Sequence, residues 1–105
     1  REALVAPDRP SLVGFRAVDP ARRLRAGAHF IAAGKTAIME NDEGYMTSVA
    51  HSPHLNRWIG LGLLAHGPAR IGERIRAVDP IRNEEIEVEV CSPAFIDPEG
   101  ERLHG

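Results

Sequence analysis

The residues best suited to chemistry lie close together in the middle of the chain, where Ser48, His51, Ser52 and His54 follow one another. Two nearby histidines could bind a metal ion, but a metal site needs at least a third ligand, and no Cys-x-x-Cys or His-Glu-x-x-His pattern supplies one. A serine beside a histidine could form a nucleophile and its base, yet neither serine lies in the Gly-x-Ser-x-Gly pattern of a nucleophile elbow. We therefore expect strand and turn residues here, with no metal site and no catalytic residue in the chain.

Three other residues have side chains that could react or bind a ligand. Trp58, beside Arg57, could stack on a flat ligand, although a lone tryptophan more often anchors a core or an interface. Cys91 is the only cysteine, so no internal disulfide can form, and we expect a small buried residue at the end of a strand. The glycines form no Gly-x-Gly-x-x-Gly pattern before a helix, which excludes a phosphate-binding loop of that kind.

Length and charge limit the kinds of partner. The chain has 105 residues and a formal net charge of −2, with its positive charges scattered along the sequence. Nucleic-acid binding requires clustered positive charge, so we expect no nucleic-acid partner. The longest apolar run, Ile59 to Ala65, is too short to span a membrane, and no charged-then-apolar leader opens the chain. We expect one cytoplasmic domain with no membrane partner.

The first residues differ in character from the rest of the sequence. The chain begins at Arg1 rather than at methionine, and Pro7 and Pro10 lie in a stretch without any apolar period, which is typical of a linker. We interpret residues 1–10 as a linker or arm, and the chain as a fragment of a longer polypeptide or a processed product.

Short strands separated by turns must position the side chains discussed above. No helix long enough to connect parallel strands is indicated, so we expect an all-β barrel or sandwich of about six or seven short strands. Asp19 can cap one short helical turn that starts at Pro20 and ends at Gly27. Strands are expected at residues 11–18, 29–32, 36–40, 45–50, 59–65, 74–78 and 85–90, with turns at residues 34–35, 41–44, 67–68 and 79–84.

Two strands have a clear division between their faces. In residues 85–90 the apolar residues alternate with glutamates, which predicts a half-buried antiparallel strand with a solvated acidic face. In the strand that begins at Ile59, Leu61 and Leu63 share one face while Gly60 and Gly62 share the other. We expect the leucine face to fill the barrel and the bare glycine face to contact a neighbouring domain; the alternative is that the glycines face the barrel interior.

Several segments resemble a known family. Residues 44–62, reading Gly-x-Met-Thr-Ser and then Ser-Pro-x-Leu-x-Arg-x-Ile-Gly-Leu-Gly, resemble the C-terminal barrel domain of the aminomethyltransferase (glycine-cleavage T-protein) family. Residues 12–15 are similar to the first strand of that domain, and residues 92–105 resemble the end of the alpha subunits of heterotetrameric sarcosine oxidases. The resemblance covers residues 11–105 and implies a small Greek-key-like β-barrel.

The resemblance implies a larger protein around this domain. In the family the barrel is the last of three domains around a channel that holds tetrahydrofolate, and the carboxylate that handles folate lies in the earlier domains. The implied partners are the upstream folate-binding domains of the same chain and the other sarcosine oxidase subunits. FAD or FMN and NAD are expected only elsewhere in the complex, and no cofactor is expected on this fragment alone. Arg57 and Phe95 are the candidates for lining the folate channel; unlike T-proteins, which place a tyrosine near the C-terminus, the chain has no aromatic residue after Phe95.

The implied function is that of a non-catalytic barrel that helps to wall the tetrahydrofolate channel while sarcosine is oxidatively demethylated to glycine. Two alternatives stay open. One, which the same resemblance allows, is the barrel of a T-protein or a dimethylglycine-dehydrogenase-like enzyme, and the other is a non-enzymatic β-barrel interaction module.

Overall fold

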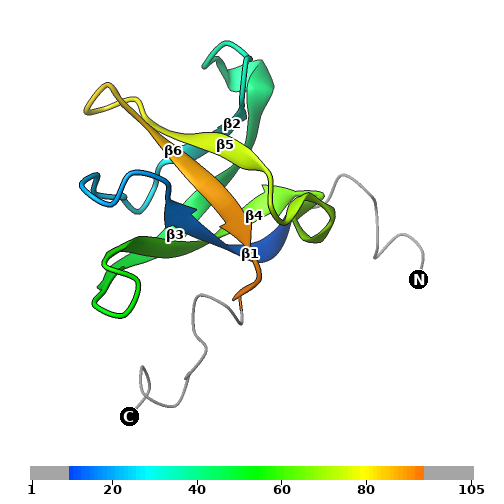
Figure 1. Cartoon of the computed structure of the whole chain (residues 1–105). Coiled ribbons are helices and arrows are strands. Elements are labelled where there is room, and N and C mark those ends of the chain that lie inside the picture. The colour runs from blue at the N-terminus through cyan, green and yellow to red at the C-terminus, as the bar shows by residue number, and fades with distance from the viewer. Residues whose placement is uncertain (1–9, 94–105) are drawn as a thin grey trace.

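Six antiparallel strands form a closed barrel in the computed structural model, which describes residues 10–93 (Figure 1). The strands are β1 (Pro10–Ala17), β2 (His29–Ala32), β3 (Asp42–Ser52), β4 (Arg57–Ala65), β5 (Arg74–Asp79) and β6 (Glu84–Cys91), and two 3-10 turns are η2 (Met39–Asn41) and η3 (Gly67–Arg70). The predicted all-β class is confirmed. No helix among the described residues is long and apolar enough to cross a membrane.

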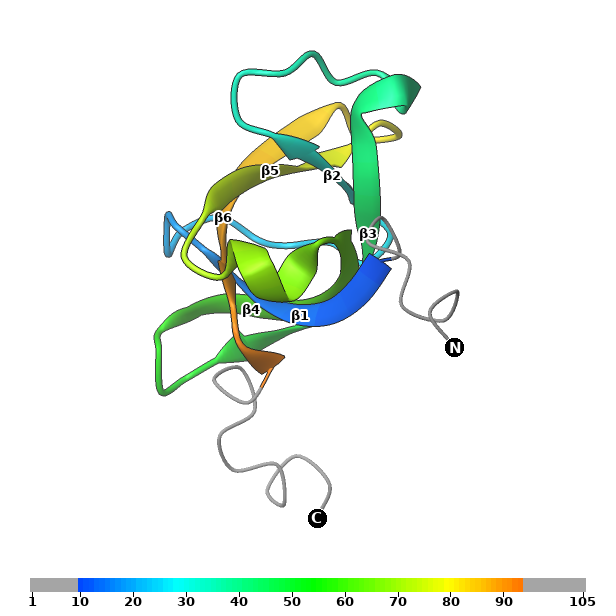
Figure 2. The ribbon, with the colours of Figure 1, turned by 90° about the vertical axis from the view of Figure 1, so that its right-hand side faces the viewer.

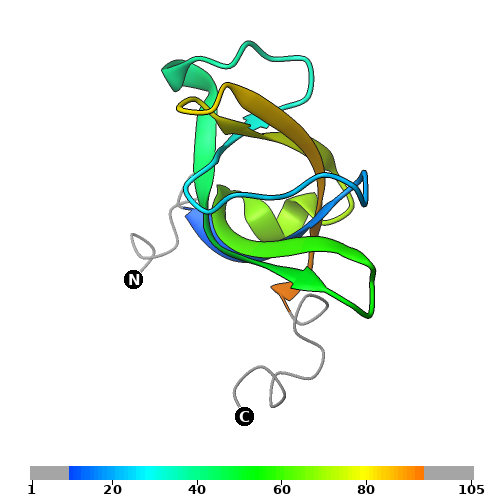
Figure 3. The same cartoon turned by 90° about the vertical axis from the view of Figure 1, so that its left-hand side faces the viewer.

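The strand order around the barrel is β1-β4-β3-β2-β5-β6, and β1 pairs with β6 to close it. Strands β2, β3 and β4 follow one another as antiparallel neighbours, while β1 lies beside β4 and is joined to β2 by a long connection. This arrangement is a Greek key, as the resemblance implies. Figures 2 and 3 show the strands as a ring from opposite sides, with η3 facing the viewer in Figure 2.

The barrel interior is filled by apolar side chains around two stacked aromatic rings. Phe15 on β1 and Phe30 on β2 are fully buried, and their ring centroids lie 4.2 Å apart with an interplanar angle of 22°. The strand-β6 prediction is confirmed, because its apolar residues point into this core and its glutamates point out. The other buried members of the core are Val13, Ala17, Leu24, Ala28, Met46, Leu64, Ile75, Ala77, Ile86, Val88 and Val90.

The two faces of β4 are the reverse of the prediction. Gly60 and Gly62 are buried and face the interior, whereas Ile59, Leu61 and Leu63 lie on the outer face of the barrel. A Cβ atom at Gly62 would lie 2.7 Å from the backbone oxygen of Tyr45 and 3.0 Å from the ring of Phe30. The reason is steric, since the Phe30 ring and the backbone of β3 leave room only for glycine at position 62, and the Met46 side chain and the Ser48 backbone oxygen do the same at position 60.

Two local predictions were also wrong. The residues after Asp19 form a turn rather than a helix: the Asp19 carboxylate accepts a hydrogen bond from the Ala21 N–H (2.9 Å), and the chain then runs irregularly so that Leu24 can enter the core. Residues 36–40 form bends and the start of η2 instead of a strand. There the Thr36 carbonyl accepts hydrogen bonds from the Ile38 N–H (2.8 Å) and the Asn41 side-chain amide (2.7 Å), so local bonds replace strand pairing.

The turn expected at residues 41–44 also lies elsewhere. Strand β3 already begins at Asp42, and Gly44 is paired with Leu64 inside the sheet. Gly44 has a φ of +151°, and a Cβ atom there would meet the backbone of Leu63. Glycine is therefore required here because β3 and β4 approach closely, and not because the chain turns.

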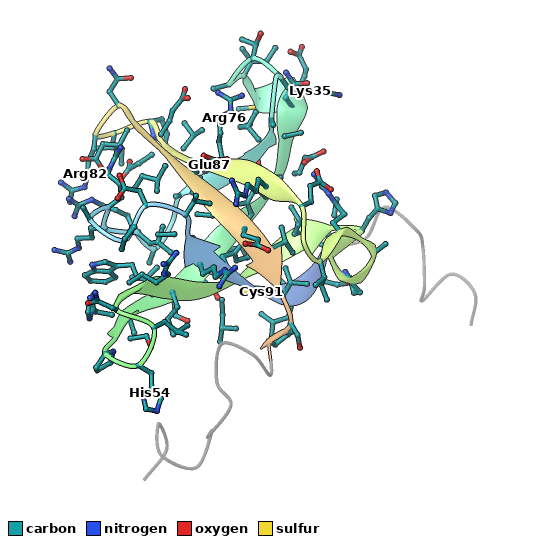
Figure 4. All side chains as sticks on the ribbon, viewed as in Figure 1. Lys35, His54, Arg76, Arg82, Glu87 and Cys91 are labelled. Atoms are coloured by element: carbon teal, nitrogen blue, oxygen red, sulfur yellow. The ribbon has the colours of Figure 1, made fainter. Side chains whose placement is uncertain are left out.

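The outer face of β5 and β6 carries paired charges. Arg76 lies 2.9 Å from Glu85, and Arg16, from the neighbouring β1, lies 2.8 Å from Glu89. Arg74 and Glu87 form a longer pair at 4.0 Å. We call these six residues the Arg–Glu ladder; Figure 4 shows Arg76 and Glu87 on this side of the barrel. Such half-exposed pairs contribute little stability, but they keep this face compatible with water.

Candidate functional site

Arg57, the predicted channel residue, lies at the start of β4 and is held by the backbone. Its Nη1 donates hydrogen bonds to the carbonyl oxygens of Ala17 (3.0 Å) and Val18 (3.2 Å), where β1 ends. Its Nε donates a longer bond to the Leu55 carbonyl oxygen (3.4 Å). The guanidinium therefore ties the β3–β4 hairpin to the end of β1 and is fixed in one position. Phe95, the other predicted channel residue, lies outside the described residues.

Trp58 follows Arg57 on β4 and is half-buried. Its side chain packs against the main core, which confirms the core-packing interpretation. The guanidinium carbon of Arg23 lies 4.9 Å from the centroid of the Trp58 ring, and the ring of His51 meets it edge-on at 5.8 Å. A cation over an indole face is a favourable contact. The indole therefore contacts the core and the Arg23 guanidinium, so its ring is not free to stack on a flat ligand.

The serines and histidines of β3 and the β3–β4 turn lie in strand and turn positions. The Ser52 hydroxyl accepts a hydrogen bond from the Leu55 N–H (3.2 Å), which closes the turn between β3 and β4. His54 lies at the tip of that hairpin, away from the barrel (Figure 4). Ser48 and His51 are exposed on β3. Within residues 10–93, no group of three or more His, Cys, Asp or Glu side chains is placed to hold a metal ion.

A pair of polar residues that sequence reasoning missed lies in a hollow at the end of the barrel formed by the β2–β3 loop. His29 Nδ1 is 2.7 Å from Asp42 Oδ2, although the two groups are not aligned for a hydrogen bond. The remaining lining is apolar, and the hollow has a volume of about 250 Å³. Its wall consists of His29, Ile31, Ala37, Ile38, Met39, Asp42, Val78 and Pro80. Ligand pockets usually measure about 300–1,000 Å³, so this hollow suits a single side chain or small ring better than a folate.

Arg70 fastens the turn η3 to the barrel. Its guanidinium lies 2.9 Å from Glu43 on β3 and 2.8 Å from Glu73, and it donates a hydrogen bond to the Ala65 carbonyl oxygen (3.2 Å). The hydrogen bond from Arg70 lowers the pKa of the Glu73 carboxyl below its ordinary value. This group stabilises the chain reversal between β4 and β5 and is not arranged for proton transfer.

Cys91 is buried at the end of β6, as expected, and contacts Ile59 on the outer side of the sheet. Burial raises the pKa of its thiol from 9.0 to about 11.

The raised pKa of Cys91 should slow its alkylation. Only the thiolate is alkylated, so at pH 8 the native chain should react with iodoacetamide about a hundredfold more slowly than the chain in denaturant, because a rise of two pKa units lowers the thiolate fraction about a hundredfold. The free energy of unfolding should also fall as the pH rises from 9 through 11, because the unfolded chain loses the thiol proton first. Equal alkylation rates with and without denaturant would contradict the burial.

Comparison with known proteins adds a family to this geometry. Residues 11–97 match the family described as the glycine cleavage T-protein C-terminal barrel domain. The sarcosine oxidase alpha subunit of Rhizobium meliloti is 46% identical over 99% of this chain, and that of Corynebacterium sp. strain P-1 is 38% identical over 100% of it. The chain spans only 10% and 11% of the lengths of these two relatives.

A solved structure shares the fold. The glycine cleavage system aminomethyltransferase T from Bartonella henselae aligns with a TM-score of 0.61 and 21% identity, over 91% of this chain and 24% of that one. The alignment shows that the two chains share a fold.

Proposed function

Since the chain belongs to the family of glycine cleavage T-protein C-terminal barrel domains, we propose that it is the barrel of a sarcosine oxidase alpha subunit. The observation that carries the proposal is the 46% identity to such a subunit across 99% of this chain. In this proposal residues 1–10 are a linker or arm, residues 11–105 are the barrel domain, and the parent complex is cytoplasmic.

In this role the barrel is not catalytic and helps to wall a tetrahydrofolate channel, together with upstream domains of the same polypeptide. The parent enzyme demethylates sarcosine to glycine at a flavin held elsewhere in the complex, NAD also binds elsewhere, and the one-carbon unit passes to folate. The support is the family membership and the names of the relatives.

Arg57 is the described residue that we assign to the channel. Its hydrogen bonds to other described residues use Nε and Nη1, which leaves Nη2 to donate to a ligand. A guanidinium fixed by backbone carbonyls is preorganised for a carboxylate such as the glutamate tail of a folate, because little side-chain freedom is lost on binding. Phe95 is proposed as an apolar wall of the same channel.

Replacing Arg57 in the assembled sarcosine oxidase tests this assignment. Arg57→Ala should weaken tetrahydrofolate binding by roughly ten- to a hundredfold, the range for one lost hydrogen bond between charged groups, while sarcosine oxidation itself continues. The measurements are sarcosine consumed and 5,10-methylenetetrahydrofolate formed at several folate concentrations.

The matched control is Arg74→Ala, since Arg74 is an exposed arginine of the Arg–Glu ladder. Because Arg57 also ties β4 to β1, Arg57→Lys is needed as a second variant that keeps the charge. Unchanged folate capture in a folded Arg57→Ala enzyme would remove Arg57 from the channel.

A further inference from the structure

The outside of the barrel has two chemically different sides. One side carries the Arg–Glu ladder on β5, β6 and the edge of β1. The other side, over β1, β4 and β3, carries apolar side chains that the predicted β4 orientation would have placed inside. We call it the outer leucine face and define it by Leu12, Tyr45, Ile59, Leu61 and Leu63.

The strand register makes this face continuous. Leu63 on β4 is paired with Leu12 on β1 and with Tyr45 on β3, so three large side chains lie side by side across the sheet. Leu12 is 49% exposed and Tyr45 is 46% exposed. Further along β4, Leu61 and Ile59 form a small apolar cluster with Leu55 and Cys91 that is separate from the core.

A contiguous exposed apolar patch on one side of a small domain marks an interaction surface. The contrast within this barrel strengthens that interpretation, because its other side, on β5 and β6, carries water-compatible pairs such as Arg76–Glu85. The cross-strand neighbours at the centre of the face are uncharged: Leu12 and Tyr45 pair with Leu63, and Gly14 and Ser48 pair with Leu61. A charge lies at its edge, where Arg16 of the Arg–Glu ladder is the register partner of Ile59. Leu61 and Leu63 are half-buried and Ile59 is 7% exposed, so Leu12 and Tyr45 are the exposed part of the face. Leaving these two side chains in water has no structural benefit for the isolated barrel.

We infer that the outer leucine face docks against the neighbouring domain of the longer polypeptide, an inference that rests on the proposed function. The curated relatives are roughly tenfold longer than the region they share with this chain, so they contain ample chain to cover it. β1 begins at Pro10, only two residues before Leu12, so the segment that precedes β1 joins the barrel beside one end of this face. A domain upstream in the longer polypeptide is therefore connected close to the face.

The size of the face favours a covalently attached partner over a separate molecule. Domains within one chain associate through modest interfaces, because the connection holds them at a high effective concentration. Separate subunits must also offset the loss of translational and rotational freedom, which usually requires a larger buried area. A face centred on Leu12, Leu63 and Tyr45 suits the first case. The occupant should present an uncharged, apolar surface, since the centre of the face offers no charged partner.

The experiment compares charge insertion in the full-length alpha-subunit polypeptide and in the 105-residue chain. Tyr45→Arg and Leu12→Arg place a charge on the most exposed part of the face, and Ile81→Arg, at a position that is 93% exposed in the β5–β6 turn, is the matched control. In the full-length protein the two face variants should lower the melting temperature of the barrel by roughly 4–8 °C and speed amide exchange in β1 and β4. In the 105-residue chain the same variants should leave the melting temperature nearly unchanged.

Each other outcome is decisive. If the face variants and the Ile81→Arg control behave alike in the full-length protein, the docking inference is wrong. If the variants unfold the 105-residue chain equally, the face serves the barrel's own stability, and the inference is again wrong. If the 105-residue and full-length proteins both dimerise through this face, the occupant is a second copy instead. If folate capture fails but the differential melting persists, the docking stands and the folate role does not.

Discussion

Gly62→Val is expected to destabilise the barrel by about 1–3 kcal/mol, the usual cost of overpacking a core. The added Cβ would lie 2.7 Å from the backbone oxygen of Tyr45 and 3.0 Å from the Phe30 ring. A side chain could rotate away, but a strand backbone in a closed barrel cannot move without breaking its pairing. The unfolding midpoint in urea at constant m-value measures the loss.

The matched control for this change is Leu63→Val, which introduces the same residue at the next position of β4 on the opposite face. We expect a much smaller effect, because Leu63 has solvent beside it and valine suits a strand. If Gly62→Val were tolerated as well as Leu63→Val, the inward orientation of the glycines would be incorrect.

Phe30→Ala should cost more, about 3–5 kcal/mol, because it removes a fully buried ring and leaves a cavity beside Phe15. For a barrel of this size such a loss is a large part of the total stability, so the variant should be partly unfolded at room temperature. Circular dichroism together with urea unfolding shows the effect. Ile81→Ala, on a side chain that is 93% exposed, is the control and should change little.

Combining the two changes tests whether they share one space. The ring of Phe30 is one of the groups that a Cβ at Gly62 would meet, so its removal should relieve part of the crowding. The double variant should therefore lose less stability than the sum of the single variants. Strict additivity would show that Phe30 is not what keeps position 62 small.

Sequence reasoning identified the strands better than their orientation. In β6 the alternation predicts the orientation as well, because the strand has glutamates on one face and mainly valines on the other, and burial of the glutamate face would be unfavourable. In β4 both faces lack charge between Ile59 and Leu64, so the period of two shows which residues share a face but not which face is inside. The choice depends on Phe30 and Met46, side chains from other strands that occupy the space inside Gly60 and Gly62.

The candidate site was less predictable for the same reason. Arg57 could be named from the family pattern, but its anchoring to the carbonyls of Ala17 and Val18 joins segments about forty residues apart. The contact between His29 and Asp42 depends on the irregular pairing of β2 with β3, which contains a register shift. No spacing rule brings those two residues together, because a β-bulge moves side chains between faces in a way that the local sequence does not signal.

The pairing of β1 with β6 has a consequence for how the barrel is made in the cell. The ion pair between Arg16 and Glu89 joins residues 73 positions apart, and the ladder between these two strands closes the ring. During translation β1 leaves the ribosome first and β6 last. The edge of β1 that pairs with β6 therefore stays unpaired while the rest of the domain is synthesised. Ring closure therefore follows translation of Cys91, and the long separation makes it a slow step. Until then, the nascent β1 has an unpaired edge that can pair with another chain.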